Sequence, residues 1–307
     1  MTRINESIID PIDVNLIKSE LTKDCLLRTT KSGSNELYIF DYKTCPNTLR
    51  EIGRLRELSF RDAGGGTGRA CDLDEDDLSD DGYMQLIVWD PAAEEIIGGY
   101  RYIVSNSKQT KHLSTEHYFK FSDKFREEYL PYMIELGRSF VQPKYQGRKG
   151  NPKGIFALDN LWEGIGAIST RNPHIKYLFG KVTMYVDYNL SARSELMYFL
   201  KRYFCDSESL LIPIYPIEIL FDSESLDKLY CADNYIDNYK ILSKRVREHG
   251  ETIPPLVNAY MNLSPSLKVF DTVSNPHFGG VEETGMLITI EDIYATKYDR
   301  YIVATRE

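Results

Sequence analysis

Residues 134–141 constrain the fold and the function of this chain more than any other stretch of the sequence. Apolar and aromatic side chains recur through the segment and Pro143 closes it, which predicts a strand. The strand carries a carboxylate, Glu135, and a guanidinium, Arg138, which would point to opposite faces of a regular strand. A β-bulge at Gly137 would bring both to one side, and bulges are frequent next to active sites. A core strand with a structural salt bridge is the alternative that these residues leave open.

A glycine-rich basic turn, PKYQGRKG at residues 143–150, follows this strand. Helical periodicity then predicts a helix over 154–170. A helix N-terminus with free backbone N–H groups is a ready anion site. Strand and turn together indicate a protein that holds an anionic carrier group beside an acid/base pair. An ordinary surface turn is the alternative interpretation.

The other periodic segments predict an α/β (α+β) fold, a mixed central sheet flanked by helices. No linker or low-complexity segment interrupts residues 37–307, which we expect to form a single domain. Residues 1–36 are a polar N-terminal extension with one amphipathic stretch at 14–21. The further predicted strands are 37–40, 83–89, 95–104, 177–186, 267–272 and 285–290, and the further predicted helices are 48–62, 191–205, 235–248 and 254–263.

A dense acidic loop occupies residues 71–81. Like charges this close repel, so such a loop is solvated unless it binds a cation. An EF-hand is excluded because the glycine and the terminal glutamate are not at the required positions. Two arginines offer partners: Arg56 lies on one face of the preceding helix with Phe60, and Arg101 lies inside a predicted strand, where a charge is costly when unpaired. The functional interpretation is a site for an amine.

Composition narrows the function classes. A net charge of −9 argues against nucleic-acid binding, because a polyanion prefers a basic surface. Five widely spaced cysteines without a CxxC pattern indicate free thiols in a reducing cytoplasm and no metal site. We find no secretory signal and no apolar run long enough to span a bilayer, so we expect a cytoplasmic protein. The apolar run 210–221 is broken by two prolines; it could be core, line an acyl tunnel or make peripheral membrane contact.

The turn at 143–150 resembles the pantetheine-binding turn of the GCN5-related N-acyltransferases. Acyl-homoserine-lactone synthases, which use acyl carrier protein as donor, have a signature similar to a set of residues in this chain. The family's tryptophan after the phenylalanine is absent here, where Gly65 and Gly66 stand. The similar set is Arg56, Phe60, Asp74, Asp77, Arg101, Glu135 and Arg138.

The C-terminal patterns at 253–263 and 275–278 resemble the hemolysin-like, ornithine-lipid-type N-acyltransferases, which usually have aspartate where Asn275 stands. This resemblance implies a GNAT-like acyl-CoA N-acyltransferase fold. It also implies transfer of a fatty acyl group, with or without a 3-hydroxyl, from acyl carrier protein (ACP) or acyl-CoA to an amino acid such as ornithine or glycine. The product would be an N-acyl amino acid, a lyso-aminolipid. No permanently bound cofactor is implied.

The resemblance also implies roles. Glu135 is the candidate base, acting through water, and Arg138 orients Glu135 or the acidic loop. Tyr185 or Tyr188 could protonate the departing thiolate. The implied acceptor-binding residues are Asp74, Asp77, Arg56, Arg101 and Phe60, the implied donor-binding residues are Phe140, Val141, Gln146, Gly147, Arg148, Lys149 and Gly150, and the basic patch Lys144, Arg148, Lys149 and Lys153 is a docking hypothesis for the acidic carrier protein.

Two other functions remain open from the sequence. One is a signal synthase that acylates S-adenosylmethionine, as acyl-homoserine-lactone synthases do. The other is a non-catalytic module that binds an acyl group or a carrier protein.

Overall fold

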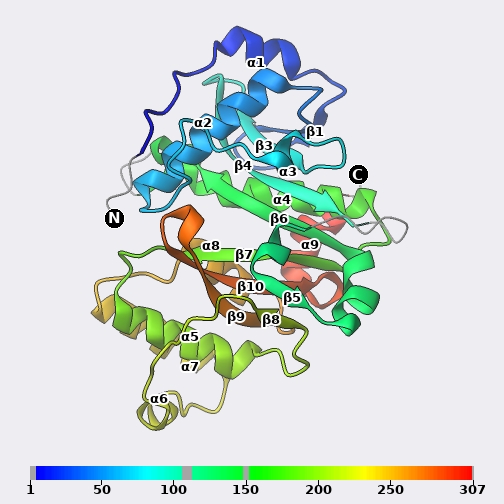
Figure 1. The fold of residues 1–307 in the computed structure, drawn as a ribbon. Helices are drawn as coiled ribbons and strands as arrows, with labels where there is room; N and C mark the ends of the chain where they lie inside the picture. Colours follow the sequence, from blue (N-terminus) through cyan, green and yellow to red (C-terminus); the bar gives the residue numbers. More distant parts are fainter. Residues whose placement is uncertain (1–4, 106–112, 148–151, 306–307) are drawn as a thin grey trace.

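A computed structural model describes residues 5–105, 113–147 and 152–305. Within these residues the main sheet has the order β1-β2-β3-β4-β6-β7-β10-β9 (Figure 1). Of the described strand pairs, β6 with β7 is parallel and its neighbours are antiparallel, so the sheet is mixed, as predicted. The strands are β1 Leu26–Thr29, β2 Glu36–Phe40, β3 Met84–Asp90, β4 Glu95–Val104, β6 Met133–Val141, β7 Tyr177–Met184, β9 Lys268–Asn275 and β10 Val281–Thr289.

Helices cover both faces of this sheet. Alternate residues of a strand point to opposite faces, and β3 shows the consequence: Ile87 and Trp89 pack in a cluster with helix α2 (Pro46–Asp62), whereas Leu86 and Val88 pack in a cluster with helix α4 (Ala157–Arg171). Burial on both sides explains why β3 reads as a continuous apolar run.

The remaining elements extend the two layers. A second sheet pairs β5 (Phe119–Phe121) with β8 (Leu211–Pro213). Figure 1 shows α1 at one end of the molecule and α6 at the other. The other helices are α1 Val14–Glu20, α3 Glu75–Leu78, α5 Leu190–Phe204, α6 Ser223–Leu229, α7 Tyr235–Glu248, α8 Pro255–Met261 and α9 Ala295–Tyr301. Short segments are the π-helical η2 Phe125–Tyr129 and the 3-10 turns η1 Ser114–His117, η3 Leu130–Tyr132, η4 Pro143–Tyr145, η5 Pro152–Phe156, η6 Pro276–Phe278, η7 Ile290–Asp292 and η8 Val303–Thr305.

The predicted elements agree with this architecture, with two informative differences. The helix expected from residue 154 begins at Ala157, because η5 precedes it. The N-terminal extension is joined to the sheet: β1 pairs with β2, and the carboxylate of Glu20 accepts hydrogen bonds from the backbone N–H groups of Asn47 (2.9 Å) and Thr48 (2.8 Å) in the first turn of α2.

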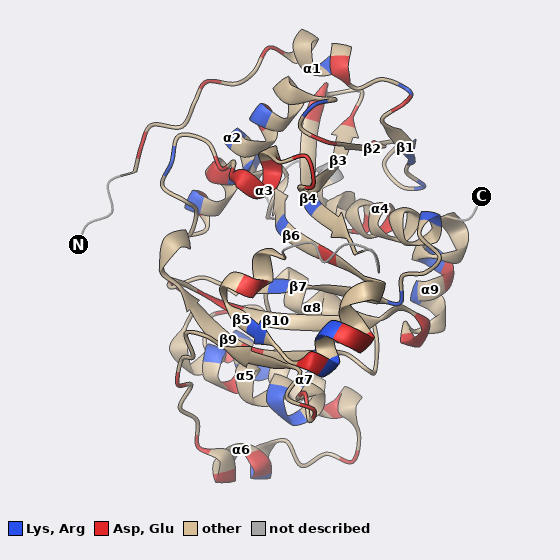
Figure 2. Cartoon of the chain, turned by 45° about the vertical axis from the view of Figure 1, so that its right-hand side comes forward, with Lys and Arg blue, Asp and Glu red and all other residues tan. Residues whose placement is uncertain are grey.

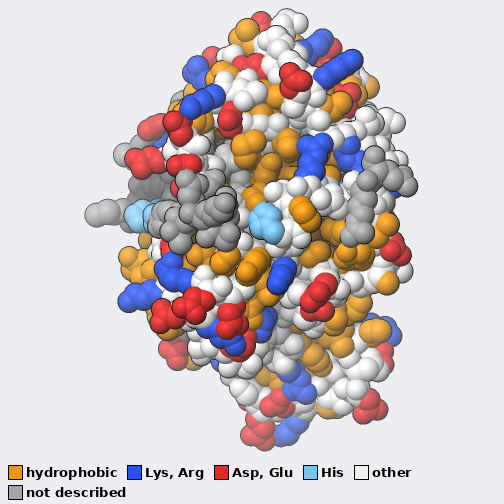
Figure 3. Space-filling view, turned by 90° about the vertical axis from the view of Figure 1, so that its right-hand side faces the viewer, with side chains coloured by type: hydrophobic (Ala, Val, Ile, Leu, Met, Phe, Trp, Pro, Cys, Tyr) orange, Lys and Arg blue, Asp and Glu red, His pale blue; other side chains and the backbone are white. Residues whose placement is uncertain are grey.

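Along the described part of the chain, no helix has both the length and the apolar character needed to cross a bilayer. On the face drawn in Figure 3, blue and red side chains are interspersed among the described residues.

The feature that positions the candidate site is the divergence of β6 from β7. The two strands pair over Met133–Leu136 and Tyr177–Gly180. Beyond that point β6 continues beside β4 as far as Val141, and β7 continues beside β10 as far as Met184. The sheet therefore opens between β6 and β7 in its middle.

Candidate active site

A cavity of about 980 Å³ lies where β6 and β7 diverge. Residues 136–141 of β6 form one side, and residues 181–183 of β7 with Tyr185 form the other. The cavity therefore reaches both faces of the sheet. One wall is charged and faces α3, and the other is apolar and includes Leu158 of α4 and residues 254–257 at the start of α8.

A β-bulge turns Arg138 toward the charged wall. The register between β4 and β6 shifts between Gly99 and Arg101, with Arg101 opposite Gly137 and Gly99 opposite Phe140. The bulge expected near Gly137 is thus present, and Arg138 itself adopts the left-handed conformation, φ 48°. A non-glycine residue at positive φ is uncommon and costs backbone energy.

The side chain of Arg138 binds the acidic loop rather than Glu135. Its Nε lies 3.2 Å from Oδ2 of Asp72, and its Nη2 lies 3.4 Å from Oδ2 of Asp74. The guanidinium carbon is also 4.6 Å from the centre of the Phe278 ring. Of the two roles expected for Arg138, these contacts support orientation of the acidic loop.

Arg101 contacts three carboxylates of the same loop. Its nitrogens lie 2.6 Å from Asp74, 3.1 Å from Asp76 and 3.3 Å from Asp77. Its guanidinium also lies over the Tyr83 ring at 4.8 Å. Figure 2 shows the red acidic residues of α3 beside blue positions on β4 and β6.

Arg56 completes the network and does not line the cavity. This side chain is fully buried; its Nη1 lies 3.0 Å from Asp77, and its Nη2 donates to Gln85 at 2.6 Å. Gln85 in turn donates to Asp77 at 3.0 Å. Asp74 and Asp77 also accept each other's backbone N–H in a capping box at the start of α3. The acidic loop is therefore pinned by three arginines, the arrangement expected for Arg56 and Arg101.

Burial and the neighbouring arginines shift the pKa values of these carboxylates in opposite directions. Burial alone would raise the pKa of Asp77, but the guanidiniums of Arg56 and Arg101 hold that pKa well below its ordinary value. Burial raises the pKa of Asp72 and of Asp76, with Arg138 and Arg101, respectively, opposing the rise. Asp77 is thus a fixed anion at neutral pH.

Glu135 lies beside this network but is not among the residues that line the cavity. It is 1% exposed. One carboxylate oxygen accepts from the Thr115 N–H at 3.0 Å and from the hydroxyls of Ser114 and Thr115; the other accepts from the Ser114 N–H at 3.2 Å and from the Tyr83 hydroxyl. These contacts do not support direct access to an amine, so the expected base role stays a prediction. They identify a positioning role, because Ser114 and His117 of the η1 turn that Glu135 holds line the cavity.

The predicted acceptor residues fall into two layers. Asp74, Arg101 and Phe60 line the cavity, whereas Arg56 and Asp77 are buried behind them. Phe60 packs edge-on against Phe278 with ring centres 5.0 Å apart.

The predicted donor residues Phe140, Val141, Gln146 and Gly147 also line the cavity. Arg148, Lys149 and Gly150 lie outside the described residues. The turn passes very close to η5: a Cβ on Gly154 would lie 1.9 Å from the carbonyl oxygen of Tyr145, so only glycine fits there.

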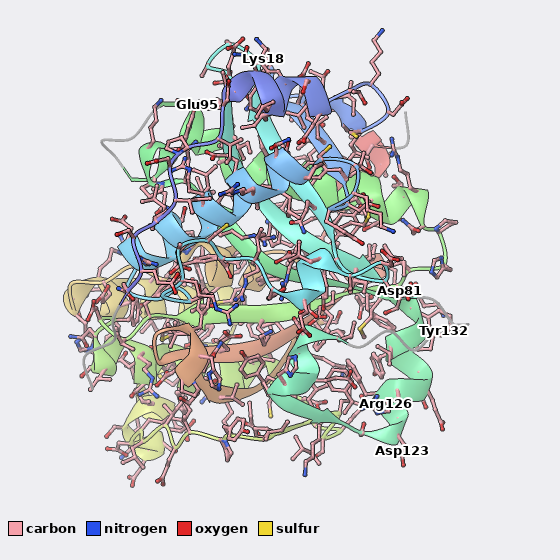
Figure 4. All side chains as sticks on the ribbon, turned by 45° about the horizontal axis from the view of Figure 1, so that its top comes forward. Lys18, Asp81, Glu95, Asp123, Arg126 and Tyr132 are labelled. Carbon is pink, nitrogen blue, oxygen red and sulfur yellow. The ribbon has the colours of Figure 1, made fainter. Side chains whose placement is uncertain are left out.

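Part of the predicted basic patch is neutralised. Lys144 Nζ lies 2.5 Å from Oε1 of Glu95, a residue labelled near the edge of the molecule in Figure 4. The same glutamate accepts a hydrogen bond from the Tyr145 hydroxyl at 3.1 Å. Nothing is described of the side chain of Lys153.

A second charged group on the cavity wall was not predicted. Lys181 of β7 and Glu283 of β10 both line the cavity, with Nζ and Oε2 3.6 Å apart. Asn275 of β9 donates to Oε1 of Glu283 at 2.5 Å. The ammonium of Lys181 lies 4.9 Å from the centre of the Tyr118 ring. One hint of Lys181 was present in the sequence, because residues 181 and 183 are polar and alternate with apolar residues in the predicted strand 177–186. Glu283 could not be placed in this way, because it lies just outside the predicted strand 285–290.

Three further expectations concern the cavity. The apolar run 210–221 does not line it; Leu210 and Leu211 are core, and Leu220 is exposed. Tyr185 lines it, whereas Tyr188 donates to the carbonyl of Thr252 at 3.1 Å. The described residues contain no group of three His, Cys, Asp or Glu side chains suited to a metal ion.

Comparison with known proteins places these features in a family. Residues 55–152 match the family model described as an acetyltransferase (GNAT) domain. Two proteins named glycine N(alpha)-acyltransferase, from Phocaeicola vulgatus and Bacteroides thetaiotaomicron, are each 49% identical over 302 residues. The alignments cover 97% of this chain and 93% and 90% of those proteins. The solved structure of the AHL synthase LasI aligns with a TM-score of 0.32 and 19% identity, over 48% of this chain and 71% of that one.

Proposed function

This chain belongs to the GNAT-related N-acyltransferases, and from that membership we propose that it transfers a fatty acyl group from a carrier thioester to the α-amine of glycine. The product is an N-acylglycine, a lyso-aminolipid. Glycine is proposed over ornithine because both full-length relatives carry the name glycine N(alpha)-acyltransferase.

The observation that carries the proposal is a single cavity with two unlike walls. Its charged wall holds Asp74, Arg101 and Arg138, which suits a small zwitterion, and its apolar wall holds Leu158, with Leu256, which suits an acyl chain. Amide formation from a lipid thioester and an amino acid requires both environments to meet at one point.

The donor is proposed to enter where β6 and β7 part. Strand edges that lack a partner leave peptide N–H and C=O groups to be satisfied, and an extended guest can pair with them. The amide groups of a phosphopantetheine arm are such a guest. Gln146, Gly147 and the close approach at Gly154 place the glycine-rich turn beside that opening. Acyl-ACP is proposed as the carrier and acyl-CoA is the alternative that shares the same arm.

The reaction is an aminolysis. The ammonium of glycine loses a proton, the neutral nitrogen attacks the thioester carbonyl, and a C–N bond forms as the C–S bond breaks. Peptide N–H groups at the Arg138 bulge are proposed to stabilise the oxyanion. The second nitrogen proton passes to the departing sulfur. Tyr185 is a poor acid for that step, since burial raises its pKa to about 12, above the ordinary thiol pKa of about 8.5.

Incubation of the purified protein with long-chain acyl-ACP and an equimolar pool of amino acids tests the proposal. We expect mass spectrometry to show N-acylglycine as the main product. Parallel reactions with acyl-CoA identify the carrier, and reactions with S-adenosylmethionine test the signal-synthase alternative. Predominant acylation of another amine, or no amide at all, would overturn the proposal.

A further inference from the structure

The reaction needs a group that faces the cavity and can take a proton from the acceptor, and a carboxylate is one such group. Four described carboxylates line the cavity: Asp74, Glu75, Asp76 and Glu283. Asp74 and Asp76 form ion pairs with Arg101 at 2.6 and 3.1 Å, so a ligand that binds either carboxylate competes with an arginine. Glu75 is exposed to solvent. Among these four, Glu283 is the buried one, 5% exposed, and its ion pair among the described residues is with a lysine and not with an arginine.

The surroundings of Glu283 leave one of its oxygens open to a ligand. Its Oε1 accepts the side-chain N–H of Asn275 at 2.5 Å. Its Oε2 faces Lys181 at 3.6 Å, an ion-pair distance that is too long for a hydrogen bond. A ligand that donates to this oxygen therefore displaces no hydrogen bond among the described residues.

Lys181 offers the complementary charge. Its side chain is 13% exposed, and its ammonium lies over the Tyr118 ring. An ammonium has three donors, and the long contact with Glu283 leaves them available to an anion in the cavity. The other cations that line the cavity are occupied or exposed: Arg101 and Arg138 bind the acidic loop, and Arg69 is exposed.

An α-amino acid carries its amine and its carboxylate on one carbon. A buried anion and a half-buried cation that lie side by side can therefore meet both groups at once. Resting on the function proposed above, we propose that Lys181 binds the α-carboxylate of the acceptor and that Glu283 accepts the proton from its α-ammonium. The proton then leaves Glu283 for solvent through the cavity.

The side chains that face Glu283 come from several elements packed against it. Lys181 faces it from β7, Asn275 from β9, and Tyr118 and Tyr185 from the segments beside β5 and β7. Burial, reinforced by the charge of Glu283, raises the pKa of both tyrosines to about 12, so they keep their protons in a neutral assay.

The carboxylate-binding role is tested by the ratio of kcat/KM for glycine to kcat/KM for glycinamide. In Lys181→Met we expect this ratio to fall about tenfold or more, because a charged hydrogen bond to the carboxylate is lost. The ratio is measured within one preparation, so it does not depend on the fraction of folded enzyme. Arg69→Met is the matched control, a cation on the same cavity whose loss should leave the ratio unchanged. An unaltered ratio in Lys181→Met, or a fall in Arg69→Met instead, overturns the assignment.

The proton-accepting role is tested with Glu283→Gln. We expect kcat to fall about 100-fold or more near neutral pH. The deficit should shrink as pH rises, because the free amine then forms without the enzyme. Glu282→Gln is the control: Glu282 precedes Glu283 on β10 and pairs with Arg193, and its loss should leave both rate and pH profile unchanged. A deficit that is constant with pH, or no deficit, overturns the role.

The two levels of failure are distinguishable. If wild-type enzyme forms no N-acylglycine, the proposed function fails. If wild-type enzyme forms it and both variants match wild type, only the Lys181 and Glu283 assignment fails.

Discussion

Arg138 shows how single residues are held under strain at this site. Its left-handed φ of 48° costs roughly 1–2 kcal/mol of backbone energy. That conformation turns the guanidinium toward Asp72 and Asp74, while the Phe278 ring covers its face. The strain is tolerated because the bulge places a cation against the buried Asp72, whose ion pair among the described residues is with Arg138.

Arg56 should be a determinant of stability rather than of chemistry. Arg56→Met removes a fully buried guanidinium from Asp77 and leaves a buried anion poorly compensated. We expect the free energy of unfolding, measured by chemical denaturation, to fall by about 3–5 kcal/mol. The exposed pair of Asp80 on the acidic loop and Lys43 between β2 and α2 provides the control, since Lys43→Met should produce no measurable change.

The ion pair of Arg56 and Asp77 also makes the stability of the folded protein depend on pH. Because the folded-state pKa of Asp77 is held below its unfolded value, its contribution to stability is present above the ordinary aspartate pKa of about 3.9 and is lost as pH falls through the folded value. Acid unfolding of Arg56→Met should therefore begin at a higher pH than that of wild type. If Arg56→Met and wild type unfold over the same range of acid pH, Arg56 does not hold the Asp77 carboxylate ionised.

Glu135→Gln tests whether this carboxylate positions η1 or exchanges a proton. An amide places its NH₂ group against the N–H and O–H donors of Ser114, Thr115 and Tyr83. We expect a loss of about 1–3 kcal/mol in unfolding free energy. If Glu135 only positions η1, the slope of kcat/KM against pH should match wild type, because Glu135 is not among the residues that line the cavity. A variant of normal stability that has lost the low-pH activity of wild type would restore Glu135 as the base.

The sequence was informative wherever a residue's environment had a local signature. A cation inside a buried strand must have a partner, and this rule predicts that Arg101 contacts the acidic loop. The role of Glu135 could not be deduced in the same way, because η1 has no periodic pattern. Glu283 was missed because its strand begins four residues earlier than the apolar pattern indicated, so its face was unassigned.

At the scale of elements, the divergence of β6 and β7 creates the site. The bulge at Arg138 bends β6 beside β4, and β7 continues with β10, so neither strand can close the gap without leaving its other partner. Strand positions were predictable from alternation and apolar runs. The parallel pairing of β6 and β7, and the point at which it ends, depend on contacts between segments far apart in the chain.

Gly154→Ala tests the contact between η4 and η5 that shapes the donor turn. The new Cβ would clash with the carbonyl of Tyr145, so the start of η5 must move away. We expect KM for the acyl donor to rise about tenfold or more, with a smaller change in KM for glycine, measured by steady-state kinetics.

Gly250→Ala is the control for that substitution. Gly250 has a φ of 82° and open space around it, and it does not line the cavity. Its replacement should lower stability without changing KM for the donor. Equal effects of the two variants on the donor KM would contradict a role for the turn in donor binding.

At the scale of the whole molecule, the protein is acidic, with a net charge of −9 and a local basic sequence at residues 144–153. An acidic carrier protein would be repelled by most of the surface and steered to that segment. The overall α/β class followed from composition and the order of periodic segments, since few other arrangements bury so many alternating strands and amphipathic helices.

Salt should therefore affect large and small donors differently. Raising the ionic strength from about 0.05 to 0.3 M shortens the screening length to below about 8 Å, so KM for acyl-ACP should rise several-fold. KM for the corresponding acyl-pantetheine, which lacks the carrier protein, should stay nearly constant. A flat response for acyl-ACP would remove electrostatic docking from the account.

The most direct measurement follows thiol release and amide formation in one reaction, with acyl-ACP and ¹⁵N-glycine as substrates. The account predicts one ¹⁵N-labelled N-acylglycine for each free pantetheine thiol. Thiol release without labelled amide, or label in no acylated product while the protein remains folded, would contradict acyl transfer to glycine at the opening between β6 and β7.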